Sequence, residues 1–399
     1  MIIPDGPVNR LCPNGFFDEY LRYTQFQRSP EDFHLWVAVN LVSTALGRRC
    51  YIDQGYFKVY PNTYVVLVAE SANLSKSTCI NIGIKLLQEA CPNLEFFSQK
   101  GTAESLIHHL SLSFEEFDVA ECNLTIPEFA TFFGNSKMDP ALMHLITDYY
   151  DSPDNRSYTT IARGKEIVNN ICLNVMAGTT IEWMRSCIPT AELGGGFIAR
   201  LLMVHRSSTP RDIAFPGMMM GNPEVEEAKR RCLNDLQSIY KLQGEFTYTN
   251  KGKGAFLEWF SEYKDKQHGT PIMRGYYGRK DTSLLKLAMV SSASKTNSMI
   301  IDEKDILYGL TMLAANEESM IKVSEGLGQT EVGRRLDLVY RKIQKAGIIT
   351  QSMLMSQLTF CMNSREMAEV IDTLRKSGKI KSKNDGGRRV YSLNEGNGK

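Results

Sequence analysis

The stretch TYVVLVAESANLSKSTCINIGIKLLQEA, residues 63–90, joins an apolar run to a segment with helical spacing. Its first seven residues, 63–69, are rich in β-branched side chains, which is typical of a strand buried on both faces. Residues 76–90 follow with the pattern of a helix. A buried strand that leads into a helix is the unit from which parallel sheets are built. The stretch therefore predicts an α/β fold.

The same alternation continues toward the C-terminus. Further strands are expected at 94–98, 123–126, 170–178 and 199–205. Helices are expected at 102–112 and 138–149. Because parallel strands need a crossover connection, strands that alternate with helices predict βαβ units and a mostly parallel sheet. We assign residues 61–215 to this core.

Mostly helical segments flank the core. In residues 1–60, a helix is expected at 33–46, with Ser29 as its N-cap and Pro30 at its first position. Two short strands are expected after it, at 48–53 and 57–60. Residues 216–328 form a second helical region, with helices expected at 223–241, 252–267, 280–295 and 303–323.

The charge is distributed unevenly. The 399 residues carry a net charge of only +1, which as an average argues against a broadly basic nucleic-acid binder. Residues 330–399, however, hold 14 Lys or Arg and 7 Asp or Glu, whereas the rest holds 32 and 38. A slightly acidic body is thus joined to a basic C-terminal module, and DNA becomes an expected partner.

Composition also points to a compartment. No apolar run approaches the ~20 residues of a membrane span, so no membrane contact is expected. The N-terminus has no basic-then-apolar leader. The nine cysteines form no CxxC pair and the six histidines show no ligand spacing. These features predict a reduced, cytoplasmic protein without a structural zinc site.

The basic module, residues 329–399, shows three helices and a terminal hairpin. Helices are expected at 330–346, 351–358 and 363–376, and strands at 348–349, 379–383 and 388–393. Asn384-Asp385-Gly386-Gly387 gives a strong turn signal between the last two strands. This order is that of a winged helix, a variant of the helix-turn-helix.

In the winged-helix interpretation, 363–376 is the recognition helix and 384–387 the tip of the wing. Eight basic residues lie on or beside these elements: Arg365, Arg375, Lys376, Lys379, Lys381, Lys383, Arg388 and Arg389. Such a patch would neutralise DNA phosphates and make binding depend on salt. The alternative is a solvated domain that contacts other proteins.

The turn after the first strand has the residues of a phosphate-binding loop. Lys76 could reach the terminal phosphates, and the hydroxyl of Ser77 or Thr78 could meet Mg²⁺, at the start of a helix. The loop contains no glycine, although the small Ser71 and Ser75 leave room for a phosphate. The alternative is an ordinary strand–loop–helix with a surface lysine.

Three other residues could complete a nucleotide site. Glu128 ends the strand in NLTIPEF (123–129), where an acid could polarise water or hold Mg²⁺. Thr180 ends the next strand and could sense the γ-phosphate. Arg200 ends the glycine-rich GGGFIAR (194–200) and suits an arginine finger. The alternative for Glu128 and Thr180 is that each only stabilises the start of the helix that follows it. The alternative for Arg200 is a solvated side chain in a surface turn.

Together, several blocks resemble a family of RecA-like P-loop ATPases from the replication modules of phages, plasmids and integrated elements. The resemblance covers roughly residues 30–210. It is carried by SPEDFHLWVAVNLVSTALGRR (29–49), YPNTYVVLVAESANLSKST (60–78), IPEF (126–129), LITDYYDSPDNRSYTTIARGKE (145–166), LNVMAGTTIEWM (173–184) and LGGGFIARLLMV (193–204).

The resemblance implies a role for each candidate. Lys76 would contact the β- and γ-phosphates of ATP, with Ser71, Ser75 and Thr78 around them, and Ser77 would bind Mg²⁺. Glu128 would be the general base, Thr180 the sensor, and Arg200 a finger that acts on a neighbouring subunit. This sequence departs from the family pattern in its glycine-free loop and in Pro127, which stands where an Asp is common.

The resemblance further implies a homo-oligomer, arranged as a ring such as a hexamer, that acts on DNA with replication partner proteins. The first hypothesis is therefore an ATP-driven DNA translocase or helicase. Two alternatives remain at the level of sequence. One is a non-hydrolysing DNA-binding adaptor with a degenerate nucleotide pocket, which the glycine-free loop favours. The other is a helicase loader, which the sequence does not separate from the first hypothesis.

Overall fold

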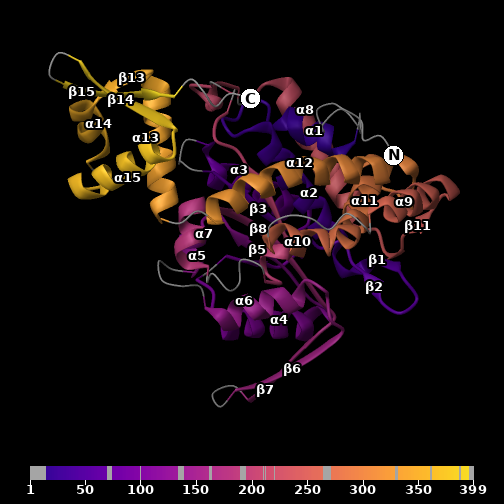
Figure 1. Cartoon of the computed structure of the whole chain (residues 1–399). Coiled ribbons are helices and arrows are strands. Elements are labelled where there is room, and N and C mark those ends of the chain that lie inside the picture. The colour runs from indigo at the N-terminus through magenta and orange to yellow at the C-terminus, as the bar shows by residue number, and fades with distance from the viewer. Residues whose placement is uncertain are drawn as a thin grey trace. The chain divides into compact units, whose positions relative to one another are not determined.

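The chain forms two compact units in the computed structural model, Met1–Leu327 and Gly328–Lys399. The structure describes residues 15–69, 74–98, 100–133, 139–160, 164–188, 195–209, 211, 213–219, 221–263, 271–328, 331–359, 362–385 and 388–394. The larger unit is built around a parallel sheet, and the smaller one combines three helices with three short strands (Figure 1).

The central sheet has five strands, all parallel, in the order β4-β5-β8-β3-β9. They are β4 (Phe96–Phe97), β5 (Ala120–Ile126), β8 (Ile171–Thr179), β3 (Tyr64–Val68) and β9 (Leu201–His205). Every residue of β3 and β8 is buried, because helices cover both faces of the sheet. The expected α/β class is confirmed, and this sheet is compatible with a RecA-like core.

Helices pack on the two faces of the sheet (Figure 1). One layer contains α2 (Glu31–Leu46) and α3 (Lys76–Ala90), and the other contains α4 (Ala103–Phe117) and α6 (Pro140–Tyr149). Tyr64 shows how β3 faces the second layer, because its hydroxyl donates to the carbonyl of Ile146 at 2.8 Å. The strand-to-helix connection expected over 63–90 is confirmed, with α3 beginning at Lys76.

Other helices complete the larger unit. They are α1 (Phe16–Tyr23), α5 (Phe129–Phe133), α7 (Ile181–Cys187), α8 (Pro223–Tyr240), α9 (Asn250–Tyr263), α10 (Pro271–Tyr277), α11 (Lys280–Thr296) and α12 (Glu303–Gly328). All four helices expected in residues 216–328 are present among them. Their apolar faces merge with the sheet into one continuous hydrophobic core.

Short strands add features that the sequence pattern did not indicate. The two expected short strands, β1 (Cys50–Asp53) and β2 (Lys58–Val59), are present and pair with each other, but β1 also pairs in parallel with β10 (Gly244–Glu245). A further antiparallel hairpin joins β6 (Asn155–Thr160) to β7 (Gly164–Asn169). Finally, β11 (Thr247–Tyr248) pairs with β12 (Ile300–Ile301). The region 216–328 is thus not purely helical, because three of its segments serve as sheet edges.

The start of α2 corrects one prediction. Pro30, not Ser29, occupies the N-cap, and the helix ends before Gly47, whose φ is +55°. Ser29 is buried, and its hydroxyl donates to the backbone carbonyl of Ser75 at 3.1 Å. Ser29 therefore holds the loop before α3 instead of capping its own helix.

A buried network of amides and hydroxyls joins α2 to the sheet. The side-chain amide of Asn40 donates to the carbonyls of Thr63 and Val175, at 3.3 and 3.1 Å. The amide of Asn123 donates to Asn40 Oδ1 and to Thr44 Oγ1, both at 2.8 Å. Since an unpaired buried polar group is costly, these bonds favour a single register between α2 and strands β3, β5 and β8.

The smaller unit has its own hydrophobic core. Its elements are α13 (Glu331–Ala346), β13 (Ile348–Thr350), α14 (Gln351–Leu358), α15 (Ser364–Lys376), β14 (Ile380–Asp385) and β15 (Arg388–Leu393). The strands form an antiparallel sheet in the order β13-β15-β14. Asn363 caps α15 and forms a capping box with Glu366. The expected three helices and hairpin are confirmed as elements.

No helix within the described parts of the chain is long and apolar enough to cross a membrane. The seven cysteines in these parts are free thiols with buried side chains. All seven lie in the larger unit, six in helices or strands and Cys91 directly after α3, where they pack as small apolar groups.

We predict that Asn123→Ala lowers the free energy of unfolding by about 2–4 kcal/mol, because Asn40 and Thr44 would lose a buried partner. Urea denaturation measures the change. Asn234→Ala, at an exposed position of α8, is the matched control and should change stability by less than about 0.5 kcal/mol. Equal effects of the two substitutions would contradict a role for the buried network.

Candidate functional site

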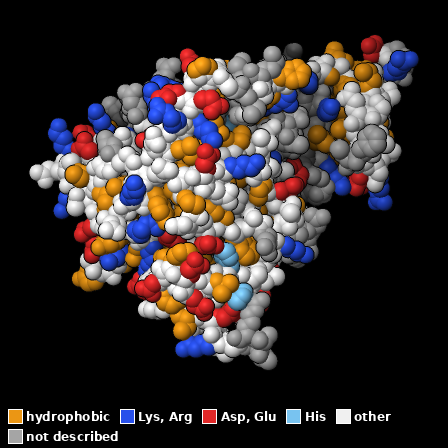
Figure 2. Space-filling view, turned by 180° about the vertical axis from the view of Figure 1, so that it is seen from behind, with side chains coloured by type: hydrophobic (Ala, Val, Ile, Leu, Met, Phe, Trp, Pro, Cys, Tyr) orange, Lys and Arg blue, Asp and Glu red, His pale blue; other side chains and the backbone are white. Residues whose placement is uncertain are grey.

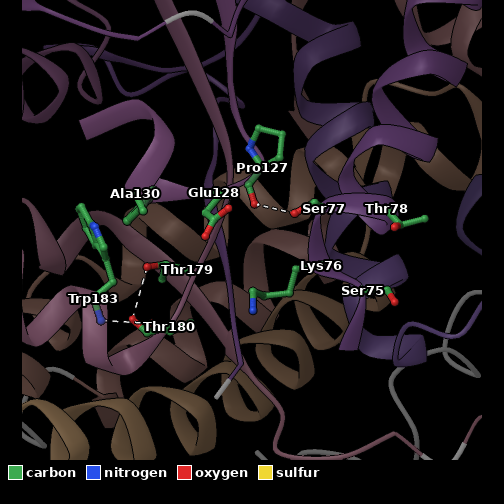
Figure 3. Close-up of a pocket in the computed structure, with 11 residues that line it drawn as sticks. Ser75, Lys76, Ser77, Thr78, Pro127, Glu128, Ala130, Thr179, Thr180 and Trp183 are labelled. Carbon is green, nitrogen blue, oxygen red and sulfur yellow. Dashed lines mark hydrogen bonds between the residues drawn. The ribbon is translucent and has the colours of Figure 1, made fainter. Parts of the chain in front are cut away.

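A cavity of about 410 Å³ opens at the carboxyl ends of β3, β5 and β8 (Figure 3). Its volume lies within the range of small-ligand sites. The residues that line it come from three connections far apart in the sequence: Ser75, Lys76, Ser77, Thr78, Pro127, Glu128, Phe129, Ala130, Thr179, Thr180 and Trp183. Ligands of open α/β sheets bind at this edge. The structure thus brings together most of the nucleotide-site candidates.

The residue directly before α3 has an unusual backbone conformation. Ser75 lies in the left-handed region, with φ 49° and ψ 41°, a conformation that usually favours glycine. The first intrahelical bond runs from the N–H of Cys79 to the carbonyl of Ser75. The N–H groups of residues 76–78 therefore precede the helical ladder at its positive end. Ser71 lies outside the described residues.

Lys76 lies half-buried at the cavity, and Glu128 stands across from it (Figure 3). The Lys76 ammonium donates a hydrogen bond of 3.3 Å to the backbone carbonyl of Ala69, which follows β3. Burial lowers the pKa of Lys76 below its ordinary value, while the carboxylates of Glu128 and Glu182 oppose that shift. The ammonium and the carboxylate therefore face one shared space, in which a phosphate could fit between them.

Ser77 connects the two sides of the cavity. Its hydroxyl donates to the backbone carbonyl of Pro127 at 3.2 Å, and Glu128 is the next residue (Figure 3). Ser77, Thr78 and Glu128 are exposed at the cavity. The hydroxyl expected to meet Mg²⁺ thus lies beside the backbone that carries the expected base.

Thr180 has a structural partner. Its Oγ1 accepts the backbone N–H of Trp183 at 3.1 Å and so caps α7. The hydroxyl of Thr179 in turn donates to the carbonyl of Thr180 at 3.4 Å. The alternative interpretation of Thr180 as a helix cap is confirmed, and its role as a phosphate sensor stays a prediction.

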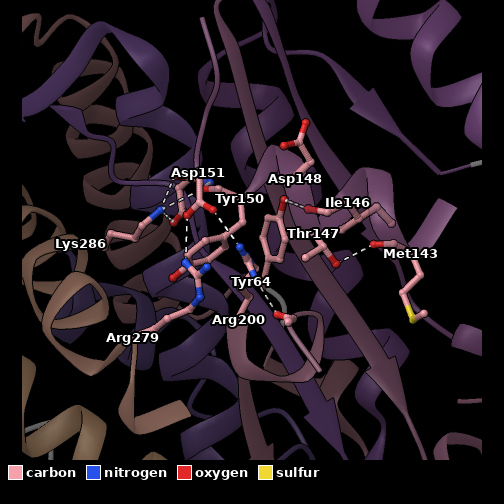
Figure 4. A network of polar contacts seen from close by, with 12 residues as sticks. Tyr64, Met143, Ile146, Thr147, Asp148, Tyr150, Asp151, Arg200, Arg279 and Lys286 are labelled. Carbon is pink, nitrogen blue, oxygen red and sulfur yellow. Dashed lines mark hydrogen bonds and ion pairs between the residues drawn. The ribbon is translucent and has the colours of Figure 1, made fainter. Parts of the chain in front are cut away.

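Arg200 does not join the cavity. It precedes β9, and β9 pairs with β3 so that Leu201 lies beside Tyr64 and His205 beside Val68. Arg200 is therefore at the amino end of the sheet, one strand length or roughly 16 Å from the end that carries Lys76. Its guanidinium is buried and pairs with Asp151 at 2.8 Å (Figure 4). From this position it cannot act on the cavity of its own chain.

Asp151 and Arg200 belong to a larger network of charges (Figure 4). The other carboxylate oxygen of Asp151 accepts from Arg279 at 3.0 Å. Burial pushes the pKa of Asp151 upward, but the hydrogen bond from Arg200 and the charge of Arg279 outweigh it and lower the pKa.

Lys286 extends this network into the core. Its ammonium donates to the backbone carbonyl of Asn62 at 3.1 Å and lies 4.0 Å from the centre of the Tyr150 ring. Burial lowers the pKa of Lys286 to about 7. No sequence signal marked Lys286 or Arg279, because a lysine or arginine on a helix usually faces solvent.

The basic residues of the smaller unit are exposed on its hairpin. Lys381 and Lys383 alternate along β14, and Asp385 pairs with Arg388 on β15, so Lys381, Lys383 and Arg388 share the face opposite the core. Arg389, on the other face, lies at the exposed end of the hairpin. In the space-filling view, lysine and arginine side chains are visible on the surface of this unit (Figure 2).

The remaining basic candidates lie on or after α15. Arg365 pairs with Glu369 at 3.3 Å and Lys376 with Asp372 at 2.7 Å, both within one helical turn. Arg375 is exposed, and Lys379 lies 5.9 Å from the centre of the Tyr340 ring. The charge of Arg365 and of Lys376 is thus partly neutralised, whereas the hairpin concentrates positive charge.

The aromatic side of the cavity was not predicted from the sequence. Trp183 and Phe129 line it with ring centroids 5.2 Å apart, and Ala130 lies beside them. These residues follow the polar ends of β8 and β5 by a few positions. An aromatic residue early in a helix is common in any core, so its type gave no functional signal.

The donor set fits a nucleotide with Mg²⁺ in its chemistry. Lys76 and the N–H groups at the start of α3 could hold phosphates, and the Ser77 hydroxyl and the Glu128 carboxylate are the oxygen donors that Mg²⁺ prefers. Among the described residues, no group of three or more His, Cys, Asp or Glu side chains could hold a metal ion.

Comparison with known proteins adds no family assignment. The sequence matches no protein-family model, and no curated protein matches it. The function of the protein is consequently inferred from its residues and their geometry.

We predict that Ser75→Gly raises the free energy of unfolding by about 0.5–1 kcal/mol, because glycine adopts the left-handed conformation without strain. Thermal and urea unfolding measure the change. Ser261→Gly deletes the same atoms within helix α9 and should lower stability by about 0.5 kcal/mol. A Ser75→Gly variant that is less stable than the wild type would contradict the left-handed conformation.

We predict that Lys286 makes stability depend on pH. Between about pH 7 and pH 10, the unfolded chain binds a proton that folded Lys286 has released, so the free energy of unfolding rises with pH. Below pH 7 both states hold the proton, and this contribution is constant.

Urea unfolding of the wild type and Lys286→Met at pH 6, 8 and 9.5 should show the wild type gaining stability relative to the variant as pH rises. Lys85→Met, an exposed position on α3, is the control and should give a constant difference. A constant difference for Lys286→Met as well would contradict the lowered pKa.

Proposed function

We propose that this protein is an ATP-dependent DNA translocase or helicase that acts in the replication of a phage or another mobile element. The observation that carries the proposal is the convergence of Lys76, Ser77, Glu128 and Thr180 on one cavity. These residues come from three separate connections of a parallel sheet. A lysine, a hydroxyl and a carboxylate around one space are what phosphoryl transfer to water requires.

Each residue has a distinct proposed task at the cavity. The Lys76 ammonium and the N–H groups of residues 76–78 would hold the phosphates by charge and hydrogen bonds. The Ser77 hydroxyl would contribute one oxygen ligand to Mg²⁺, which would neutralise phosphate charge when bound. Glu128, across from Lys76, would accept a proton from the attacking water. Thr180 could still donate its hydroxyl hydrogen to a phosphate while its oxygen caps α7.

Arg200 suits an oligomer. Its position at the amino end of the sheet means that any phosphate it contacts belongs to another copy of the chain. A homo-oligomeric ring, such as a hexamer, would bring the amino end of one sheet toward the cavity of the next. The bond to Asp151 would have to be exchanged for a bond to that phosphate.

The basic unit would supply contact with DNA. Its order of three helices and a hairpin suits a winged helix, with β14 and β15 as the wing. Lys381, Lys383 and Arg388 share one exposed face and could neutralise neighbouring phosphates. Contacts of this kind position a protein on DNA without selecting a sequence, which suits a translocase.

A second candidate function is a non-hydrolysing adaptor or helicase loader. Two sequence features favour it: the loop before α3 contains no glycine, and Pro127 stands where a second acid would help to bind Mg²⁺. Such a protein would bind nucleotide without turnover. Measurement of turnover separates the two candidates.

We predict that the wild type hydrolyses ATP and that DNA stimulates this activity. Lys76→Ala should weaken nucleotide binding, and Glu128→Gln should lower kcat by about 10²–10⁴-fold with little change in binding. Release of phosphate measures turnover, and a fluorescent nucleotide measures binding.

Two matched controls accompany these variants. Lys85→Ala changes a lysine of α3, the helix that carries Lys76, at a position outside the cavity. Glu182→Gln removes a carboxylate that acts on Lys76 but does not line the cavity. Both should retain turnover. If the wild type binds nucleotide but does not hydrolyse it in the presence of single- or double-stranded DNA, the translocase hypothesis is wrong and the non-hydrolysing adaptor is supported.

We predict that the triple substitution of Lys381, Lys383 and Arg388 by Ala weakens DNA binding and flattens its dependence on salt. The slope of log K against log salt should fall by about 2–3, since each lost phosphate contact contributes about one. Fluorescence anisotropy at 50–200 mM salt measures the slope. The control replaces Arg341, Lys342 and Lys345 of α13, which lie off the hairpin, and equal slopes in both triple variants would contradict the proposed wing.

A further inference from the structure

Gly178 directly precedes Thr179, which lines the cavity, and it lies against Pro127, another lining residue. It is the penultimate residue of β8, beside Ala177, which pairs with Ile126 of β5. A Cβ atom added at Gly178 would lie 2.5 Å from the carbonyl oxygen of Pro127 and 3.5 Å from Cδ1 of Ile80. Real Cβ atoms do not come within 3.0 Å of such an oxygen. Any other residue at 178 would therefore displace the Pro127 carbonyl.

That carbonyl is the link between the two halves of the cavity. It accepts the hydroxyl of Ser77 from the start of α3, and its peptide bond leads directly into Glu128. The Pro127 ring restricts φ at this residue, so the backbone can adjust little on one side. A displaced carbonyl would carry Glu128 with it and lengthen the bond from Ser77.

Packing of the sheet alone does not account for this glycine. Every other residue of β8 carries a side chain, and the whole strand is buried. Glycine in a strand interior weakens the strand, because it adds backbone freedom and packs no side chain. Because Gly178 has no side chain, the Pro127 carbonyl can lie close to β8.

We propose that Gly178 is a positioning residue for the hydrolytic step: it lets the Pro127 carbonyl approach β8, and so fixes Glu128 relative to Ser77 and Lys76. The inference rests on the proposed ATPase function and deepens it. It assigns to Gly178 an effect on turnover and not on nucleotide affinity, because the phosphate-holding groups belong to α3. Displacement of a catalytic group by about 1 Å can cost about 10²-fold in rate.

The first experiment compares Gly178→Ala with Gly254→Ala. Both add one methyl group, but the position of a Cβ at Gly254, on α9, is open. Gly178→Ala should lower kcat by about 10–100-fold while the dissociation constant of a fluorescent ATP analogue with Mg²⁺ stays within about threefold. Gly254→Ala should match the wild type in both.

A second readout does not depend on turnover. Trp183 packs against Phe129, which follows Glu128, so a shift of this connection changes the surroundings of the indole. The emission of Trp183, obtained by subtracting the spectrum of the same protein carrying Trp183→Phe, should shift in Gly178→Ala and not in Gly254→Ala. An unchanged emission would count against displacement.

A double-mutant cycle with Glu128→Gln separates positioning from general damage. If Gly178 acts through Glu128, Glu128→Gln should lower kcat far less in the Gly178→Ala background than in the wild type. Additive losses would overturn the inference.

If Gly178→Ala does not fold, Pro127→Gly offers a second route, because it loosens the same connection without adding atoms. It should lower kcat with unchanged nucleotide affinity, and full activity would overturn the inference. A wild type without ATPase activity would refute the proposed function itself. An active wild type with a fully active Gly178→Ala variant would refute the positioning role alone.

Discussion

The hydrogen bonds between α2 and the central sheet are the constraint on which the candidate site depends. Asn40 binds carbonyls beside β3 and within β8, and Asn123 of β5 binds Asn40 in turn. A slip of one residue in any of these strands would leave buried amides unpaired and turn apolar side chains away from the core. Because the register is determined here, the ends of β3, β5 and β8 emerge at the same edge. Lys76, Glu128 and Thr180 meet there for this reason.

The two edges of the sheet differ in chemistry. At the carboxyl edge, a cavity combines the start of α3 with an exposed hydroxyl and an exposed carboxylate. At the amino edge, Arg200 and Arg279 share Asp151, while Lys286 is buried beside Tyr150. The proposed ring would place the carboxyl edge of one sheet, with its proposed nucleotide site, against the amino edge of the next sheet, which carries Arg200.

Much of the fold could be predicted because it depends on local patterns. The apolar run 63–69 and the helical spacing of 76–90 identified β3 and α3 without any tertiary contact. The hydroxyl and lysine of the site were found in the same way. What escaped prediction depends on distant partners. The two-residue strands β10 and β12 exist only through their pairing, and Ser29 binds Ser75 across 46 positions. Gly178 is informative only once Pro127 is known to lie above it.

The central claim is that Lys76 and its surroundings form a nucleotide site. Isothermal titration calorimetry with a slowly hydrolysed ATP analogue and Mg²⁺ tests it most directly, on the full chain and on Lys76→Met, which keeps the length of the side chain but removes its charge. The account predicts one nucleotide per chain for the wild type and at least a tenfold weaker affinity for the variant. Absence of binding by the wild type, or equal affinity of both proteins, would contradict it.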